Sequence, residues 1–390
     1  EYRSISAWNK YNKQSKDNGK MVFFRPMNAQ NIQQFSDSYM RFPFDVINQQ
    51  GFSAYERAEF PYTHAFFQQK ADGSIDATQS TNKYAYTVGE INIDKKKEVQ
   101  IIICVKNNPQ ILQSCLLSLI KYKATDLCDI LVIDDRSENQ ENMDLAIAHG
   151  ASYMRVDNEK DIFNYSILNN LGAAFSRRQR KQRIICWNSD MFPTSEKTIS
   201  NLLDKHIKNK SALSGSKLLY PEETVYKSVY PNYDHVLGEN LKHAYGTIQH
   251  GGIIYAPIPP AIKTSKSYAY HPLHHWRYHP ADRYMANQDM PCVAVTGALH
   301  ILELDTFIKE GGYGCSLAST FQDIDLCQRY AEINYPIWYL GSETLLHAET
   351  ITMKAEANLF TAQYASDQLI YEYLWSTTSR LTNLLGIPTK

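Results

Sequence analysis

Polar side chains follow three short apolar runs of the sequence, and each of these polar segments could bind a ligand. Asn107 follows the first run, Asp134 and Asp135 follow the second, and Asn188 and Asp190 follow a later one. Paired carboxylates can accept hydrogen bonds from a nucleobase or a ribose, and a carboxylate can hold a divalent cation against a diphosphate. Because Asp and Ser also favour strand-ending turns, a turn without a ligand is the alternative for each segment.

Two further candidates lie late in the chain. Asp323 opens a helix with an apolar side, and a carboxylate there could take the proton of a sugar hydroxyl, which is too weak an acid to attack unaided. The alternative is N-terminal capping by Asp323, with Asp325 and Arg329 as a surface pair one helical turn apart. His347 follows a strand-like segment, and it either lies near the same site or is a buried structural histidine.

A group of histidines around Trp276 is a weaker candidate. Their spacing matches no helical metal pair, and no Cys or acidic ligand is interleaved, so a zinc site is disfavoured and a loop beside an acceptor cleft is expected. The four residues are His271, His274, His275 and His279.

The elements that must position these side chains alternate between short apolar runs and helical patterns. This rhythm predicts an α/β fold of the Rossmann-like, doubly wound kind, with a mostly parallel sheet, helices on both faces, and ligands at the carboxyl ends of the strands. The expected strands are 99–105, 130–133, 153–156 and 183–187, and the expected helices are 109–120, 143–149 and 164–180.

The regions on either side of this pattern differ from it. Residues 1–97 are rich in Gln, Asn, Tyr and Phe without a sustained period, which predicts an irregular accessory region that packs on the next part of the chain. Residues 98–350 are expected to form the main domain, and 351–390 a helical C-terminal extension.

Bulk composition narrows the function further. The 40 Lys and Arg residues against 41 Asp and Glu residues lack the positive charge on which nucleic-acid binding relies. No apolar run approaches the roughly 18 residues that cross a bilayer. Seven cysteines, an odd number without a C-x-x-C pair, fit a reducing cytoplasm. The chain begins with neither Met nor an apolar signal segment, as a trimmed or partial sequence would.

In this order, the segments resemble those of the inverting glycosyltransferase family 2, which has the GT-A fold, and one run resembles the rhamnosyltransferase-like enzymes that build bacterial surface polysaccharide. The match spans about residues 99–350. The elements that carry it are Val132-Ile133-Asp134-Asp135-Arg136-Ser137, Asn170-Leu171-Gly172, Asn188-Ser189-Asp190, Ile248-Gln249-His250-Gly251-Gly252-Ile253-Ile254, Thr296-Gly297-Ala298, Gly311-Gly312-Tyr313, Gln322-Asp323-Ile324-Asp325 and His347.

The resemblance implies a nucleotide-sugar-dependent transferase that inverts configuration at the anomeric carbon without a covalent intermediate. It implies that Asp323 is the general base, that Asp134 or Asp135 contacts the nucleoside, and that Asp190 ligates Mg²⁺ or Mn²⁺ with His347 near the metal. The implied donor-binding residues are Asn107, Asp134, Asp135, Asn170, Asn188, Asp190 and Gly297.

The resemblance further implies a UDP- or dTDP-sugar as donor and a glycan or lipid-linked glycan as acceptor, in the cytoplasm or at the inner face of the membrane. Peripheral membrane association and a homo-oligomer stay open. Three residues depart from the family pattern: Asn188 replaces the first acid of the metal motif, Asn169 stands where many members have Arg, and Gln322 replaces a Glu.

Two alternatives compete with this interpretation. A sugar-nucleotide pyrophosphorylase would need a Gly-rich, basic loop directly after the first strand, and the chain has Lys106-Asn107-Asn108-Pro109 there. A non-catalytic carbohydrate- or nucleotide-binding scaffold on the same fold would account for Asn188 and Gln322, whereas Asp190, Asp323 and His347 argue against it.

Overall fold

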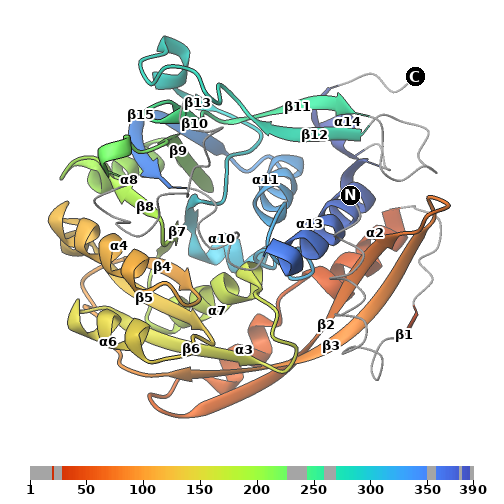
Figure 1. Ribbon diagram of the computed structural model, residues 1–390, viewed down its shortest axis with the longest axis horizontal. Helices are drawn as coiled ribbons and strands as arrows, with labels where there is room; N and C mark the ends of the chain where they lie inside the picture. Colours follow the sequence, from red (N-terminus) through yellow and green to blue (C-terminus); the bar gives the residue numbers. More distant parts are fainter. Residues whose placement is uncertain are drawn as a thin grey trace.

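The computed structural model describes residues 20–21, 29–225, 244–258, 269–348, 357–376 and 380–386. Among these, a mixed sheet runs through the molecule with helices on both faces (Figure 1). Its central strands lie side by side in the order β6, β5, β4, β7, β14, β9 and β15. They span Ser152–Asn158, Cys128–Asp135, Val99–Val105, Arg183–Asn188, Leu299–Glu303, Leu213–Leu219 and Ile337–His347.

All of these central strands run in one direction except β14, which pairs antiparallel with both β7 and β9. The predicted α/β fold with a largely parallel sheet is therefore confirmed. Because the parallel strands share a direction, their carboxyl ends and the polar residues after them meet at one edge of the sheet.

The strand β4 shows how the sheet holds helices on two faces. All seven of its residues are buried, as in a parallel strand covered on both sides. Ile101 and Ile103 pack with helices α4, α6 and α8, and Ile102 and Cys104 pack with helix α7. The four helices span Pro109–Lys121, Glu141–Ala148, Thr198–Lys208 and Tyr165–Arg178.

Gly172 lets α7 approach the sheet closely. A Cβ atom built there would lie 2.8 Å from Ile102 and 2.9 Å from Ile133, which is shorter than real contacts. A larger residue would push α7 away from β4 and β5. Since α7 carries Asn169 and Asn170, this contact also fixes how far these two residues lie from the sheet.

The N-terminal part of the chain is more regular than its sequence predicts. Strands β2 (Arg57–Gln69) and β3 (Ile75–Val88) form a long antiparallel hairpin, and β3 pairs with β6 at the edge of the central sheet. The expectation of an irregular region is thus wrong for these residues. A short strand and three short helical segments complete this part: β1 (Lys20–Met21), α2 (Ala29–Phe35), η1 (Ser36–Met40) and α3 (Phe44–Gln50).

The C-terminal extension is helical, as expected, and it packs on this hairpin. The Phe67 backbone N–H of β2 donates to the Ser366 hydroxyl (3.0 Å), and Tyr373 packs against Phe35 and Phe67. The two ends of the described chain therefore support each other, while the division at residues 97 and 350 stays a prediction. The segments are α13 (Ala357–Tyr371), η4 (Glu372–Ser376) and α14 (Arg380–Leu384).

The remaining elements include a second, two-stranded sheet. Strands β11 and β12 form a separate two-stranded hairpin above α11 in Figure 1. Within the described residues, no helix has the length and apolarity to span a bilayer. The remaining bounds are α5 (Ala124–Leu127), β8 (Met191–Pro193), β10 (Ile248–His250), β11 (Ile253–Ile258), β12 (Ala269–His274), η3 (Tyr284–Asn287), β13 (Asp289–Pro291), α10 (Leu304–Lys309) and α11 (Gln322–Glu332).

Candidate active site

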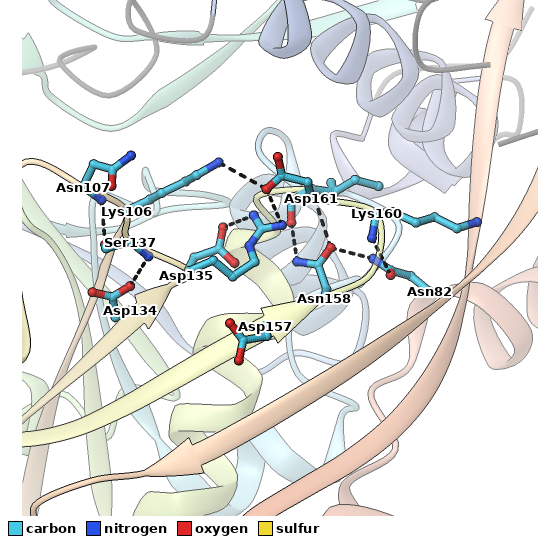
Figure 2. A network of polar contacts seen from close by, with 12 residues as sticks. Asn82, Lys106, Asn107, Asp134, Asp135, Ser137, Asp157, Asn158, Lys160 and Asp161 are labelled. Atoms are coloured by element: carbon cyan, nitrogen blue, oxygen red, sulfur yellow. Dashed lines mark hydrogen bonds and ion pairs between the residues drawn. The ribbon is translucent and has the colours of Figure 1, made fainter. Parts of the chain in front are cut away.

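The loops after β4 and β5 are joined by a hydrogen-bond network around Asp134 (Figure 2). Asp134 is fully buried and accepts from the Ser137 backbone N–H (2.7 Å) and from Asn142 Nδ2 (3.1 Å). Ser137 Oγ in turn accepts from the Asn107 backbone N–H (2.8 Å). Both carboxylate oxygens of Asp134 are therefore bound within the chain, and this residue fixes the two loops relative to each other.

Asp135 is also covered by protein. Arg136, in the left-handed backbone region, donates from Nη2 to Asp135 Oδ2 (2.5 Å), and only 1% of the Asp135 side chain is exposed. Burial raises the pKa of Asp135 to about 7, although the guanidinium of Arg136 works in the opposite direction. Of the two predicted nucleoside contacts, Asp135 thus lies behind Arg136, and Asp134 is buried and bound within the chain.

A second polar group lies at the ends of β7 and β15. His347 Nε2 lies 3.2 Å from Asp190 Oδ1 and 3.4 Å from Asn188 Nδ2, and all three side chains were predicted from the sequence. The backbone C=O of Asp190 accepts from the Ala348 N–H (2.9 Å), which ties the two strand ends together. The structure therefore brings the predicted metal-site residues into one cluster.

The tautomer of His347 suits a metal ligand. Its Nδ1 lies 3.1 Å from Gln249 Oε1, an atom that only accepts, so Nδ1 carries a proton, and in the neutral imidazole the lone pair of Nε2 points toward Asp190. A lone pair and a carboxylate oxygen 3.2 Å apart repel unless a proton or a cation lies between them. An oxygen and a nitrogen ligand with open positions for phosphate oxygens fit Mg²⁺ or Mn²⁺.

Asp323 lies at the first turn of α11 and contacts Gly297. Its Oδ2 accepts from the Gly297 backbone N–H (2.7 Å) and its Oδ1 from the Ile324 N–H (2.8 Å). A Cβ atom at position 297 would lie 2.8 Å from the Asp323 Cβ, so only glycine permits this approach. Burial raises the pKa of Asp323, and these backbone N–H groups partly oppose the shift.

The Asp323 group and the metal-site cluster are joined through two consecutive residues. Gly297 binds Asp323, and the C=O of Ala298 accepts from the Asn188 backbone N–H (3.1 Å). Asp323 and Asn188, which are far apart in the sequence, are therefore linked by two hydrogen bonds through the neighbouring residues Gly297 and Ala298. This adjacency suits a base and a metal-held leaving group that act on one substrate.

Asp367 in α13, which the sequence did not single out, holds the loop before Asp323. Its carboxylate accepts from the backbone N–H groups of Ala318 (3.3 Å), Ser319 (2.9 Å) and Thr320 (2.9 Å). Burial raises the pKa of Asp367 to about 7 against the effect of these donors. The C-terminal helix therefore sets the position of the segment that carries the candidate base.

Two residues named in the sequence analysis, Asn170 and Asp325, are bound by other residues of the protein instead of facing a ligand. Asn170 is fully buried; its Oδ1 accepts from the Tyr313 N–H and its Nδ2 donates to the Tyr313 C=O, both at 2.9 Å, so its predicted contact with a donor is not supported. Asp325 is buried, pairs with the partly buried Arg329 (2.9 Å) and accepts from Trp375 Nε1 (3.0 Å), so this pair does not lie on the surface.

The histidines around Trp276 do not form a metal site within the described residues, which contain no group of three or more His, Cys, Asp or Glu side chains suited to a metal. His274 instead pairs with buried His250, whose Nε2 accepts from the Thr296 N–H (3.3 Å) and whose Nδ1 donates to His274 Nδ1 (3.0 Å).

Comparisons with known proteins found no matching family model and no matching curated protein. Among solved structures, the chain is similar to GalNAc-T7 with UDP, GalNAc and Mn²⁺, at 13% identity and a TM-score of 0.44 over 84% of this chain and 53% of that one. It thus spans about half the length of that relative. It is also similar to the mannosyltransferase PcManGT from Pyrobaculum calidifontis in complex with GDP-Man and Mn²⁺, at 10% identity and a TM-score of 0.40 over 75% and 76% of the two chains. Membership of a particular glycosyltransferase family stays a prediction.

Proposed function

We propose that this chain is a glycosyltransferase that moves a sugar from a nucleotide sugar to an acceptor hydroxyl with inversion. The observation that carries the proposal is the adjacency of Asp323 to the Asn188, Asp190 and His347 cluster through Gly297 and Ala298. A scaffold protein would not need the Asp323 carboxylate next to a cluster that fits a divalent cation.

Asp323 acts as the general base in this proposal. Its carboxylate takes the proton from the acceptor hydroxyl as that oxygen bonds to the anomeric carbon, and the bond from this carbon to the diphosphate breaks on the opposite side. The electron pair of that bond leaves with the nucleoside diphosphate. A raised pKa makes Asp323 a stronger base than an exposed aspartate, and its two backbone donors keep its orientation fixed.

Asp190 and His347 would hold the divalent cation, with Asn188 beside them. When bound, the cation would neutralise the diphosphate and so make it a better leaving group. Gln249 keeps the Nε2 lone pair of His347 directed toward Asp190. Because Asn188 stands in place of an acid, the protein ligands carry one negative charge fewer. We therefore expect the nucleotide phosphates to contribute much of the metal affinity.

The nucleoside would lie across the ends of β4 and β5. Asn107 is the proposed contact there, Arg136 covers Asp135, and Asp134 holds the two loops in register. The proposed donor is a UDP- or dTDP-sugar, and the proposed acceptor is a glycan or a lipid-linked glycan. The synthesis of surface polysaccharide in the cytoplasm, or at the inner face of the membrane, is the setting that the family resemblance suggests.

Release of free nucleotide from a panel of UDP-, dTDP-, GDP- and CMP-sugars with Mn²⁺ tests the proposal. We expect turnover of one donor, and its loss in Asp323→Asn but not in Asp305→Asn, an exposed aspartate at the start of α10. If the Asp323→Asn variant still releases nucleotide, Asp323 is not the general base. If the chain binds a nucleotide sugar but transfers it to none of the acceptors tried, the scaffold alternative is favoured.

A further inference from the structure

The short strand β10 carries two consecutive side chains that contact different parts of the candidate site. Gln249 Oε1 lies 3.1 Å from His347 Nδ1, and His250 Nε2 accepts from the Thr296 backbone N–H (3.3 Å). Both side chains lie inside the protein, since Gln249 is 2% and His250 is 0% exposed. The strand therefore contacts both the proposed metal ligand and the segment beside the proposed base.

β10 contains a bulge at Gln249. It advances by two residues, from Ile248 to His250, where its partner strand β9 advances by one, from Leu219 to Leu218. Bulges of this kind re-aim a side chain, and they are common beside active sites. The extra residue of the bulge is the one that contacts the proposed metal ligand.

His250 is held as a neutral hydrogen-bond acceptor. Its Nε2 accepts from the backbone N–H groups of Thr296 and Gly252 (3.3 Å each), so its proton is on Nδ1, which donates to His274 Nδ1 in β12 (3.0 Å). Burial, followed by the neighbouring His274, lowers the pKa of His250 well below its ordinary value. A proton on Nε2 would face two N–H groups, so the ring stays an acceptor.

The segment that His250 holds also binds the proposed base. Gly297 directly follows Thr296, and its N–H donates to Asp323 Oδ2 (2.7 Å). Because neighbouring peptide planes share one Cα atom, a movement of the Thr296 N–H away from His250 would also turn the Gly297 N–H. The carboxylate of Asp323 would then lose one of the two backbone donors that fix its direction.

We propose that His250 is a positioning residue that keeps the backbone N–H of Gly297 directed at Asp323. It does so by holding the preceding N–H, that of Thr296. Since the residue before His250 contacts the proposed metal ligand, β10 keeps the two halves of the site in register. The role of Asp323 as the base rests on the proposed function, whereas the chain of hydrogen bonds from His250 to Asp323 does not.

Two replacements of nearly equal shape isolate the acceptor. His250→Gln places an amide oxygen near the position of Nε2, whereas His250→Met offers no strong acceptor there. We expect turnover of the nucleotide-sugar donor to fall about 10- to 100-fold in His250→Met, at unchanged donor KM, because a small misplacement of a reacting group costs that much. His250→Gln should return to within about threefold of the wild type. If urea unfolding shows that His250→Met does not fold, His250→Leu takes its place.

The pH profile separates positioning from a general loss of stability. Burial raises the pKa of Asp323 and the Gly297 N–H opposes this shift, so loss of that N–H raises the pKa further. The acid limb of the kcat profile should therefore move to higher pH in His250→Met but not in His250→Gln. His206→Met is the control, because His206 is also fully buried but lies beside Ser214 at the start of β9, at the opposite edge of the sheet. It should leave the acid limb unmoved.

Amide spectra of the ¹⁵N-glycine-labelled chain measure the same contact without turnover. Among the signals of the 17 glycines, that of Gly297 should titrate with Asp323, and Asp323→Asn identifies it by abolishing the titration. We expect the titration to persist in His250→Gln and to be lost in His250→Met. This result, without turnover of any donor, would keep the hydrogen-bond chain and reject the proposed function.

Four results would overturn the role of His250. They are equal turnover in His250→Met and the wild type, no recovery in a folded His250→Gln, a shift of the acid limb in His206→Met as large as that in His250→Met, and an unchanged Gly297 titration in His250→Met.

Discussion

The two ends of the candidate site are built in different ways. At the β4–β5 end, both oxygens of Asp134 are bound by the chain itself, and Asp135 is covered by Arg136. At the β7–β15 end, the carboxylate of Asp190 faces the Nε2 lone pair of His347, an arrangement that a cation would stabilise. Substitutions at the first end should therefore cost folding stability, and substitutions at the second end should cost binding or turnover.

Replacement of the proposed base should give the largest effect. In Asp323→Asn, turnover should fall about 10²- to 10⁴-fold, the range that general base catalysis supplies, while nucleotide affinity stays within a factor of two or so. Steady-state rates together with calorimetric binding of the product nucleotide check this. An equal loss of affinity and rate would assign Asp323 to binding.

Replacement of the proposed metal ligand Asp190 should give the second-largest effect. We expect Asp190→Asn to lower Mn²⁺-supported turnover about 100-fold, because a bound cation supplies several kcal/mol to the transition state. Its midpoint of urea unfolding should stay that of the wild type, since the Asp190 side chain supports a ligand instead of the fold. Wild-type turnover that is equal in Mn²⁺ and in EDTA would contradict the metal site.

At the β4–β5 end, we expect substitutions to lower folding stability instead of turnover. Asn142→Ala removes the donor of Asp134 Oδ2 and of Ser137 Oγ inside the protein, so the free energy of unfolding should fall by about 1–3 kcal/mol. Gln140→Ala, at an exposed neighbour, should change it by less than about 0.5 kcal/mol. Urea titration of both variants measures the difference, and equal stability of the two would remove the contrast between the ends.

A pH-dependent effect on stability is expected at Asp367, which positions the loop before Asp323. Its pKa is raised from the ordinary value of 3.8 to about 7, so the folded chain binds the proton more tightly than the unfolded chain does. The wild-type free energy of unfolding, relative to that of Asp367→Asn, should therefore fall as the pH rises from about 4 to about 7, by at most about 1.4 kcal/mol per pH unit. A difference that rises with pH would show that the three backbone N–H donors outweigh burial.

The sequence predicted the parts of the fold that local patterns control. Apolar, β-branched runs such as 99–105 lie in buried parallel strands, and the polar residues after them meet at one edge, as parallel pairing requires. The sequence did not predict the hairpin of β2 and β3. This hairpin is stabilised by pairing with β6 and by packing against α13, and no local sequence period reveals such contacts.

The site was predictable as a set of residues but not as a set of contacts. Asp190, His347 and Asp323 were singled out by type and position, whereas their supports are distant in the chain. Gln249 is 98 residues from His347, and Asp367 lies 47 to 49 residues from the N–H groups that it binds. Arg136 occupies the variable position of a sequence motif, so nothing in the sequence showed that its side chain covers Asp135.

Crystals grown with Mn²⁺ and UDP or GDP, with anomalous scattering measured at the manganese edge, would show whether Asp190 and His347 hold the cation. We expect an anomalous peak in coordination contact with Asp190 Oδ1 and His347 Nε2, and nucleotide phosphate density on the same ion with the nucleoside over the ends of β4 and β5. A nucleotide bound away from Asp190, or a manganese peak without contact to either residue, would contradict it.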